Sequence, residues 1–287
     1  MTTTADNYLK QGAFAYEQDD DWAKTPAGYE FPEAAGVEVD ANDNVYVFNR
    51  GPHPVIVYDK NGDFVRSFGE DTFTARAHGI HISPAGECWL VDDSQHAIHK
   101  FDLQGKLLWT LGNVGQPADK WSGVPFNRPT HMCVSPNSGE LYVTDGYGNS
   151  RVHRYSADGK LITSWGAVGT DPGEFCNPHN VIVDENENIL VADRENNRVQ
   201  VFDRAGAFLA EWGDFYHPMQ IWVDDRDLVF VTDQIPRISL LSADGKLIGR
   251  CRGAINGAHG ISGDAQGNLY LAELPPQEIT KLELLDA

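Results

Sequence analysis

The sequence predicts an all-β fold, a six-bladed β-propeller that forms a single domain over residues 1–287. Three observations lead to this prediction. One pattern of strands and turns recurs six times along the chain, the turns carry hairpin residues, and the N-terminus resembles the one strand that the last repeat lacks. Each repeat holds residues for about four strands, which is the content of one propeller blade.

Each repeat begins with a short apolar strand that ends near Asp, followed by a turn with Gly or Asn and a second strand that ends near Asp. A polar loop, a third strand, an Asp-x-x-Gly-like turn and a fourth strand ending near Gly complete the pattern. Turns such as DKNGD, SADGK and DAQGN have the Asn/Asp-Gly residues of tight hairpins. The repeats begin near residues 36, 78, 130, 179, 219 and 259.

The sixth repeat stops after its third strand. The segment QGAFAYE, Gln11 to Glu17, has the same pattern as the fourth strands GKLLWTLG and GAFLAEWG. We therefore expect residues 11–17 to complete the last blade, which would close the ring and leave no open sheet edge. The alternative is an open solenoid, but the polar caps that a solenoid needs are not visible.

The composition limits the partners. Hydrophobic residues make up 41% and charged residues 22% of the chain, as in globular proteins. The formal net charge of -20 disfavours nucleic acid and anionic membranes. The first twenty residues contain no apolar core of signal-peptide length, and no stretch approaches the roughly 20 apolar residues of a membrane span. Cys88, Cys133, Cys176 and Cys251 form no CxxC pair. We expect reduced thiols and a cytoplasmic location.

The repeats can be aligned on the residue that ends the first strand, and three histidines then share one position. The six residues that lie five positions earlier are Ala35, His78, Thr130, His179, Met219 and His259. Alternate blades of a six-fold ring lie about 120° apart, so His78, His179 and His259 would point toward the axis. A metal held by three histidines keeps a position open for water or substrate, and imidazole favours zinc. The alternative is that these histidines are ordinary residues at strand starts.

A second alignment selects residues on the same face. The second strand runs antiparallel to the first, so the residues that follow it lie near the predicted metal. They include Arg50, Tyr147 and Arg194. Arg194 could instead form an ion pair with Glu195 or Asp193, and Tyr147 could only pack at the rim. Because these residues would lie beside three histidines, catalytic roles for them are favoured.

Two further histidines, His131 and His217, could hold metal ligands in place. The others have no such argument. Those that we expect to be structural or solvated are His96, His99 and His153.

Several motifs carry a resemblance to a known family. They are LYVTDGYGNSRV (Leu141 to Val152), PHNVIV (Pro178 to Val183), VADRENNRVQVF (Val191 to Phe202), HGI at His78 and AHGI at His259. The repeats resemble NHL repeats. From about Gly36 onward, the chain resembles the peptidyl-α-hydroxyglycine α-amidating lyases, also called peptidylamidoglycolate lyases.

This resemblance implies a zinc ion at the propeller axis, held by His78, His179 and His259. It also implies that Tyr147 of the DGY motif is catalytic and that Arg50 and Arg194 belong to the active site. The sequence departs from the family at two positions. Gly148 replaces a disulfide cysteine, and Gly260 replaces an Asp that helps to bind a structural calcium, so a calcium site is in doubt.

Three functions remain open. The first is a zinc-dependent lyase that cleaves a carbinolamide-like (α-hydroxy-amide) or related hydroxylated small molecule, which can carry a carboxylate, into a carbonyl product and an amide or amine. The second is a metal-dependent propeller hydrolase of the lactonase kind, but such sites favour oxygen ligands around calcium-like ions. The third is a non-catalytic NHL interaction scaffold, which leaves the aligned His, Arg and Tyr residues unexplained.

Overall fold

The computed structural model describes residues 8–11, 14–252, 256–275 and 279–285, which form six antiparallel sheets. The fold is the predicted six-bladed β-propeller. The chain divides into two compact units, Met1–Phe68 with Trp222–Ala287 and Gly69–Ile221. The boundary between them falls within β19 (Pro218–Val223), the first strand of the fifth sheet.

The first unit holds the first sheet, the sixth sheet and the later strands of the fifth. The first sheet has the order β3 (Ala34–Val39), β4 (Val45–Asn49), β5 (Val55–Tyr58) and β6 (Phe64–Phe68). The fifth sheet continues from β19 with β20 (Val229–Asp233), β21 (Ile238–Leu241) and β22 (Leu247–Cys251). The sixth sheet has the order β1 (Tyr8–Gln11), β2 (Phe14–Asp19), β25 (Ile279–Leu284), β24 (Leu269–Glu273) and β23 (Ala258–Gly263).

The N-terminal segment completes the sixth sheet, as predicted. Strand β2 pairs antiparallel with β25, from Tyr16 opposite Leu284 to Asp19 opposite Lys281. It begins at Phe14, whereas the prediction began at Gln11, and residues 12–13 of the predicted segment lie outside the described residues. Strand β1 adds a fifth strand that the sequence analysis did not predict. The buried ring of Tyr16 belongs to the apolar core of this unit, so the closing strand contributes packing as well as backbone hydrogen bonds.

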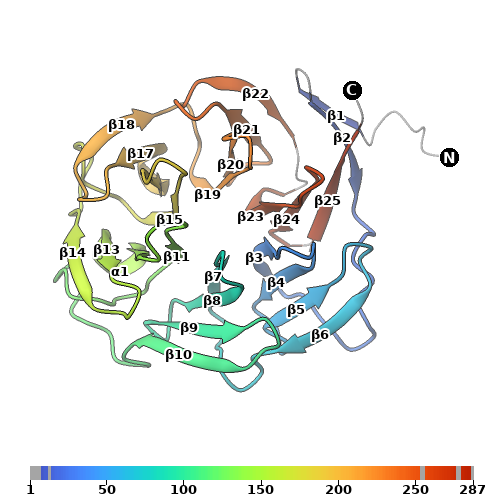
Figure 1. Cartoon of the computed structure of the whole chain (residues 1–287), viewed down its shortest axis with the longest axis horizontal. Helices are drawn as coiled ribbons and strands as arrows, with labels where there is room; N and C mark the ends of the chain where they lie inside the picture. Colours follow the sequence, from blue (N-terminus) through green and yellow to red (C-terminus); the bar gives the residue numbers. More distant parts are fainter. Residues whose placement is uncertain (1–7, 12–13, 253–255, 276–278, 286–287) are drawn as a thin grey trace. The chain divides into compact units, whose positions relative to one another are not determined.

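The second unit holds the second, third and fourth sheets. The second sheet contains β7 (Ala77–Ile82), β8 (Glu87–Asp92), β9 (Ala97–Asp102) and β10 (Leu107–Gly112). The third contains β11 (His131–Val134), β12 (Leu141–Asp145), β13 (Arg151–Tyr155) and β14 (Leu161–Trp165). The fourth contains β15 (Pro178–Val183), β16 (Ile189–Asp193), β17 (Arg198–Phe202) and β18 (Phe208–Trp212). Within this unit, β7, β11 and β15 lie innermost, and β10, β14 and β18 lie outermost (Figure 1).

Burial follows the order of strands within each sheet. Every residue of β12 and β16 is buried, whereas β14 and β18 begin with exposed residues. Apolar side chains fill the space between neighbouring sheets, with Trp89 and Val143 between the second and third, and Tyr142 and Phe202 between the third and fourth. Inner strands are covered on both faces, which explains their nearly continuous apolar sequences.

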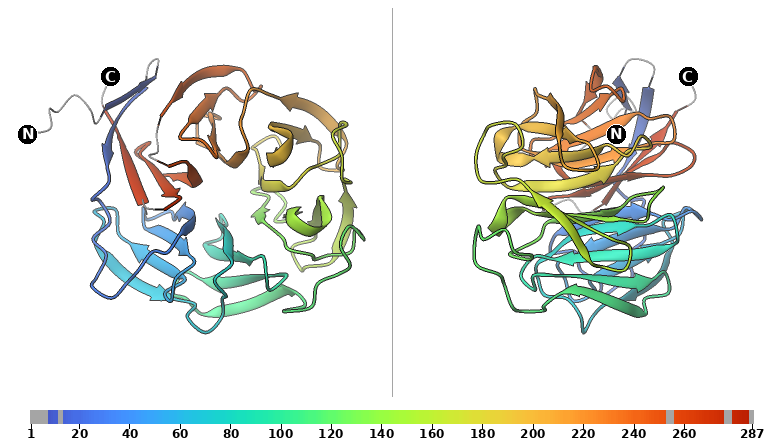
Figure 2. Two further views of the ribbon diagram at one scale, coloured as in Figure 1. Left: turned by 180° about the vertical axis from the view of Figure 1, so that it is seen from behind. Right: turned by 60° about the vertical axis from the view of Figure 1, so that its left-hand side comes forward.

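Two short helical turns follow second strands in the second unit. The helix α1 (Gly146–Asn149) follows β12, and the 3-10 turn η1 (Arg194–Asn196) follows β16. Their coils, green and yellow, are visible in the left view of Figure 2. These turns carry Tyr147 and Arg194, and they lie at the end of their sheets where β11 and β15 begin, because first and second strands are antiparallel.

Candidate active site

Two of the three predicted histidines lie side by side in the second unit. His78 is the second residue of β7, and His179 is the second residue of β15. Both side chains are buried, with 2% exposure each, and their ring centres are 4.7 Å apart. The equivalent strand positions that the sequence indicated therefore bring these two imidazoles together.

The hydrogen bonds of both histidines determine their tautomer. His78 Nδ1 lies 2.7 Å from the carbonyl oxygen of Thr130, and His179 Nδ1 lies 2.7 Å from that of Met219. A carbonyl oxygen can only accept, so each Nδ1 carries the proton and donates it. Each Nε2 of the neutral ring then presents a lone pair, the form in which histidine binds a metal.

His259 has the same local arrangement in the first unit. It is the second residue of β23, its exposure is 6%, and its Nδ1 lies 2.5 Å from the carbonyl oxygen of Ala35. The three carbonyl partners, of Ala35, Thr130 and Met219, occupy the same position as the histidines in the intervening repeats. The repeat itself therefore fixes all three imidazoles in the same form. Three such imidazoles are a donor set that zinc accepts.

Tyr147 lies directly beside His78. Its hydroxyl oxygen is 2.7 Å from His78 Nε2, and because that nitrogen can only accept, the hydroxyl donates. Arg194 Nη1 lies 3.3 Å from the same hydroxyl oxygen and donates to it. The structure therefore connects Arg194, Tyr147 and His78 in one chain of hydrogen bonds.

Two glycines allow Tyr147 to reach this position. A Cβ at Gly146 would lie 2.0 Å from the carbonyl oxygen of Pro178, and a Cβ at Gly148 would lie 2.1 Å from Asn127 Oδ1. Both distances are shorter than any real contact, so α1 can pack this closely only with glycine on each side of Tyr147. The DGYG sequence is therefore a requirement of local packing as well as a motif.

Arg194 is held by a neighbouring carboxylate. Its Nε and Nη2 lie 3.0 and 2.7 Å from Glu195 Oε1, and its side chain is 17% exposed. Burial alone would lower the pKa of the guanidinium, but Tyr147 and Glu195 outweigh burial and raise it. The ion pair with Glu195 that the sequence suggested is present, and the same guanidinium also contacts Tyr147.

The remaining predicted histidines differ in their relation to this group. His217 Nε2 lies 3.3 Å from Glu195 Oε2, so it lies next to the carboxylate that holds Arg194. His131 Nε2 instead donates to the carbonyl oxygen of Ile80, at 3.1 Å. His153, on the third strand β13, lies 3.2 Å from Asp145, and His99, on the third strand β9, lies 2.7 Å from Gln95.

Arg50 lies in the first unit, directly after β4. Its Nη1 is 2.7 Å from Glu33 Oε1, and both side chains are largely buried. Like Arg194, it forms an ion pair with a carboxylate.

The sequence analysis assigned no role to three residues near Tyr147. Asp93 is fully buried and binds two arginines, Arg76 at 2.5 Å and Arg128 at 3.3 Å. The guanidinium carbon of Arg128 lies 4.9 Å from the centre of the Tyr147 ring, and that of Arg194 lies 5.4 Å from it. Tyr147 thus contacts two cations, of which the sequence analysis identified one.

An alignment could have found the two arginines. Glu33, Arg76 and Arg128 each lie two positions before the aligned residues Ala35, His78 and Thr130. The carbonyl of each accepts the backbone N–H of a residue that follows the second strand. These N–H groups belong to Arg50, Asp93 and Tyr147, at 3.0, 3.3 and 3.3 Å respectively.

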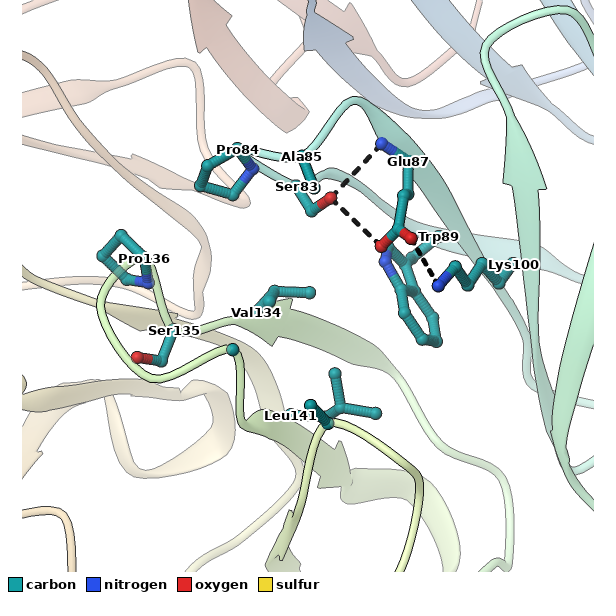
Figure 3. A pocket seen from close by; sticks show the side chains of 12 residues that line it. Ser83, Pro84, Ala85, Glu87, Trp89, Lys100, Val134, Ser135, Pro136 and Leu141 are labelled. Atoms are coloured by element: carbon teal, nitrogen blue, oxygen red, sulfur yellow. Dashed lines mark hydrogen bonds and ion pairs between the residues drawn. The ribbon is translucent and has the colours of Figure 1, made fainter.

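A cavity of about 270 Å³ lies elsewhere in the second unit (Figure 3). Its polar lining includes Ser83, Glu87, Lys100 and Ser135. Ser83 follows the end of β7, whereas His78 lies near its beginning. The cavity is therefore at the other end of the sheets, and none of the predicted site residues lines it.

All four cysteines are free thiols. Among the described residues, no helix has the length and hydropathy that crossing a bilayer requires.

Comparisons with known proteins place these features in a family. A family model for the NHL repeat matches residues 126–155 and 175–202. The streptogramin B lyase structure aligns with a TM-score of 0.69 at 14% identity, covering 97% of this chain and 98% of that one, and this likeness concerns the fold alone. Fold and repeats together define an NHL-type six-bladed propeller.

Sequence relatives indicate to which family of such propellers the chain belongs. A Caenorhabditis elegans protein named "Probable peptidyl-alpha-hydroxyglycine alpha-amidating lyase" is 30% identical over 263 residues, which cover 85% of this chain and 73% of that protein. Rat peptidylglycine alpha-amidating monooxygenase is 32% identical over 224 residues, covering 67% of this chain but only 22% of that protein. The chain belongs to the peptidyl-α-hydroxyglycine α-amidating lyase family.

Proposed function

We propose that the protein is a zinc-dependent lyase that cleaves an α-hydroxy-amide into a carbonyl compound and an amide. The observation that carries this proposal is the hydrogen-bonded chain from Arg194 through Tyr147 to His78, in a member of this family. Such a chain can hold a proton-transferring hydroxyl in one position beside a metal ligand.

We propose that His78, His179 and His259 hold one zinc ion. Their shared strand position and shared tautomer support this, because each presents Nε2 as an acceptor. In a six-bladed propeller, equivalent positions in alternate blades surround one axis. Zinc, when bound, supplies a Lewis acid that lowers the pKa of an oxygen ligand.

The reaction requires a proton to move from oxygen to nitrogen. An α-hydroxy-amide breaks down when its hydroxyl loses a proton, the C–O bond becomes a carbonyl, and the C–N bond breaks. The leaving nitrogen then takes up a proton, so no oxidant or reductant is consumed. Tyr147 is the proposed proton carrier, because its hydroxyl lies 2.7 Å from His78 Nε2, the nitrogen that would bind the metal, and a metal on that nitrogen would free the hydroxyl for proton transfer. Arg194 fixes the phenol oxygen in place and offsets negative charge that develops on it.

Arg50 and Arg194 are the proposed contacts to a carboxylate or carbonyl group of the substrate. Both are positioned by carboxylates, Glu33 and Glu195, so their side chains are ordered before substrate binds. Preorganisation of this kind lowers the entropic cost of binding. We propose a small-molecule substrate and, on the sequence argument alone, a cytoplasmic location.

Product analysis tests the reaction. The purified zinc-loaded protein should convert N-benzoyl-α-hydroxyglycine into glyoxylate and benzamide in equal amounts, followed by proton NMR. Enzyme-free solution reports the spontaneous rate. If no α-hydroxy-amide that is tried breaks down faster than this spontaneous rate, the lyase proposal is overturned. The site would then have to catalyse a different zinc-dependent reaction.

A further inference from the structure

Arg128 contacts Tyr147 with both its side chain and its backbone. Its guanidinium carbon lies 4.9 Å from the centre of the Tyr147 ring, and its carbonyl accepts the Tyr147 N–H at 3.3 Å. Its φ of 61° is left-handed, which is uncommon for a residue with a side chain. The start of the third blade therefore holds this arginine against the proposed catalytic tyrosine.

One buried carboxylate near Tyr147 holds two arginines. Arg194 pairs with Glu195, whose carboxylate also lies 3.3 Å from His217 Nε2. Asp93 is different, because its single buried carboxylate binds both Arg76 and Arg128. Two guanidinium groups on one carboxylate carry a net charge of about +1 at neutral pH, where arginine stays protonated.

The guanidinium of Arg128 can donate further hydrogen bonds. Its Nε and Nη2 donate to Asp93, whereas among the described residues its Nη1 has no hydrogen-bond partner. Its side chain is 42% exposed, and that of Arg76 is 41% exposed, compared with 17% for Arg194. Arg128 can therefore take a new anionic partner without breaking its bonds to Asp93.

We propose that Arg128, held on Asp93 together with Arg76, binds the acidic group of the substrate and sets a preference for anionic over neutral α-hydroxy-amides. This assignment rests on the proposed function, and it adds a specificity-determining residue that the sequence motifs do not contain. Guanidinium groups suit carboxylates because two parallel N–H donors match two oxygens. Asp93 holds the guanidinium group of Arg128 in place before the anion binds, so little side-chain entropy is lost on binding.

Two variants and two substrates test the proposal. Arg128→Gln removes the charge, and Arg128→Lys retains it. The substrates are N-benzoyl-α-hydroxyglycine and its carboxamide, which differ only in the acidic group. In Arg128→Gln, KM for the acid should rise about tenfold, the loss of roughly 1.4 kcal/mol, while KM for the carboxamide stays unchanged. Arg128→Lys should restore most of the affinity for the acid. A change in kcat shared by both substrates would report on the Tyr147 contact instead.

Arg204→Gln is the matched control. Arg204 is 48% exposed and shares the carboxylate of Glu140 with Arg154, as Arg128 shares Asp93 with Arg76. It lies in the turn between β17 and β18, away from Tyr147. This variant should leave both KM values unchanged. The melting temperature of each variant shows whether it is folded. If Arg128→Gln is not folded, Arg128→Lys is used to test the proposal.

A binding measurement separates this inference from the lyase proposal. N-benzoylglycine lacks the reactive hydroxyl, and N-benzoylglycinamide is its neutral counterpart. Calorimetry should show tighter binding of the acid to the parent, and Arg128→Gln should abolish the difference. If this holds in a protein that leaves α-hydroxy-amides intact, Arg128 binds anions and the lyase proposal fails. If turnover occurs but Arg128→Gln keeps the parent preference for the acid, the lyase proposal stands and the role of Arg128 is refuted.

Discussion

Replacing Tyr147 with Phe removes one hydroxyl and keeps the ring. The ring contacts to Arg128 and Arg194 do not require the oxygen, so the side chain should stay in place. The hydroxyl makes hydrogen bonds to His78 at 2.7 Å and from Arg194 at 3.3 Å. At about 1 kcal/mol for each bond, the free energy of unfolding of the metal-free protein should fall by about 1–2 kcal/mol. A metal on His78 Nε2 would replace the first of these bonds, so the unfolding measurement uses metal-free protein. If Tyr147 transfers the proton, kcat should fall about 100-fold or more, with KM and zinc content near the parent values.

The assay is steady-state turnover of N-benzoyl-α-hydroxyglycine, with urea unfolding in parallel. Tyr142→Phe is the control, because Tyr142 is a buried tyrosine of the same sheet whose hydroxyl donates to Glu140 at 3.3 Å. It should lose a similar amount of stability and keep its turnover. Parent turnover in Tyr147→Phe would show that this tyrosine only packs against its neighbours.

Two predictions concern stability. Tyr16→Ala should lower the free energy of unfolding by about 3–5 kcal/mol, because a buried ring of the closing strand is lost. Tyr16→Phe should leave the free energy of unfolding nearly unchanged, because the hydroxyl of Tyr16 has no hydrogen-bond partner among the described residues. Burial raises the pKa of this phenol to about 12. Equal losses of stability in the urea curves of the two variants would contradict this prediction. Burial also lowers the pKa of His131 to about 4, below its usual 6.5. The unfolded chain then binds more protons below about pH 6.5, so stability should fall from pH 6.5 toward 4. His131→Gln should flatten that slope, and an unchanged slope would place its origin in other groups.

The architecture could be predicted from the repeats because each blade repeats the same burial pattern. The closing strand was predicted for the same reason, since residues 14–17 continue the pattern of the fourth strands. Strand β1 could not be predicted in this way. It lies outside the four-stranded pattern of a blade, and among the described strands it pairs only with β2. No equivalent segment in the other repeats therefore indicates it.

The candidate site was predictable where it follows the repeat. His78, His179 and His259 share one strand position, and Tyr147 and Arg194 both follow second strands. Arg128 was missed because it lies in a loop, where a charged residue shows no periodicity. Its contact with Asp93, which lies 35 positions earlier, depends on the packing of one blade on the next.

Zinc titration of metal-free protein tests the central claim most directly. Protein stripped by a chelator should regain α-hydroxy-amide turnover in proportion to added zinc, with a sharp break at about one zinc per chain. His259→Ala should show no such break. His99→Ala, which alters a buried histidine on β9 that is bonded to Gln95 and Thr110, should behave like the parent. Full turnover in the chelated protein, or an unaltered titration in His259→Ala, would contradict a lyase whose zinc is held by three histidines.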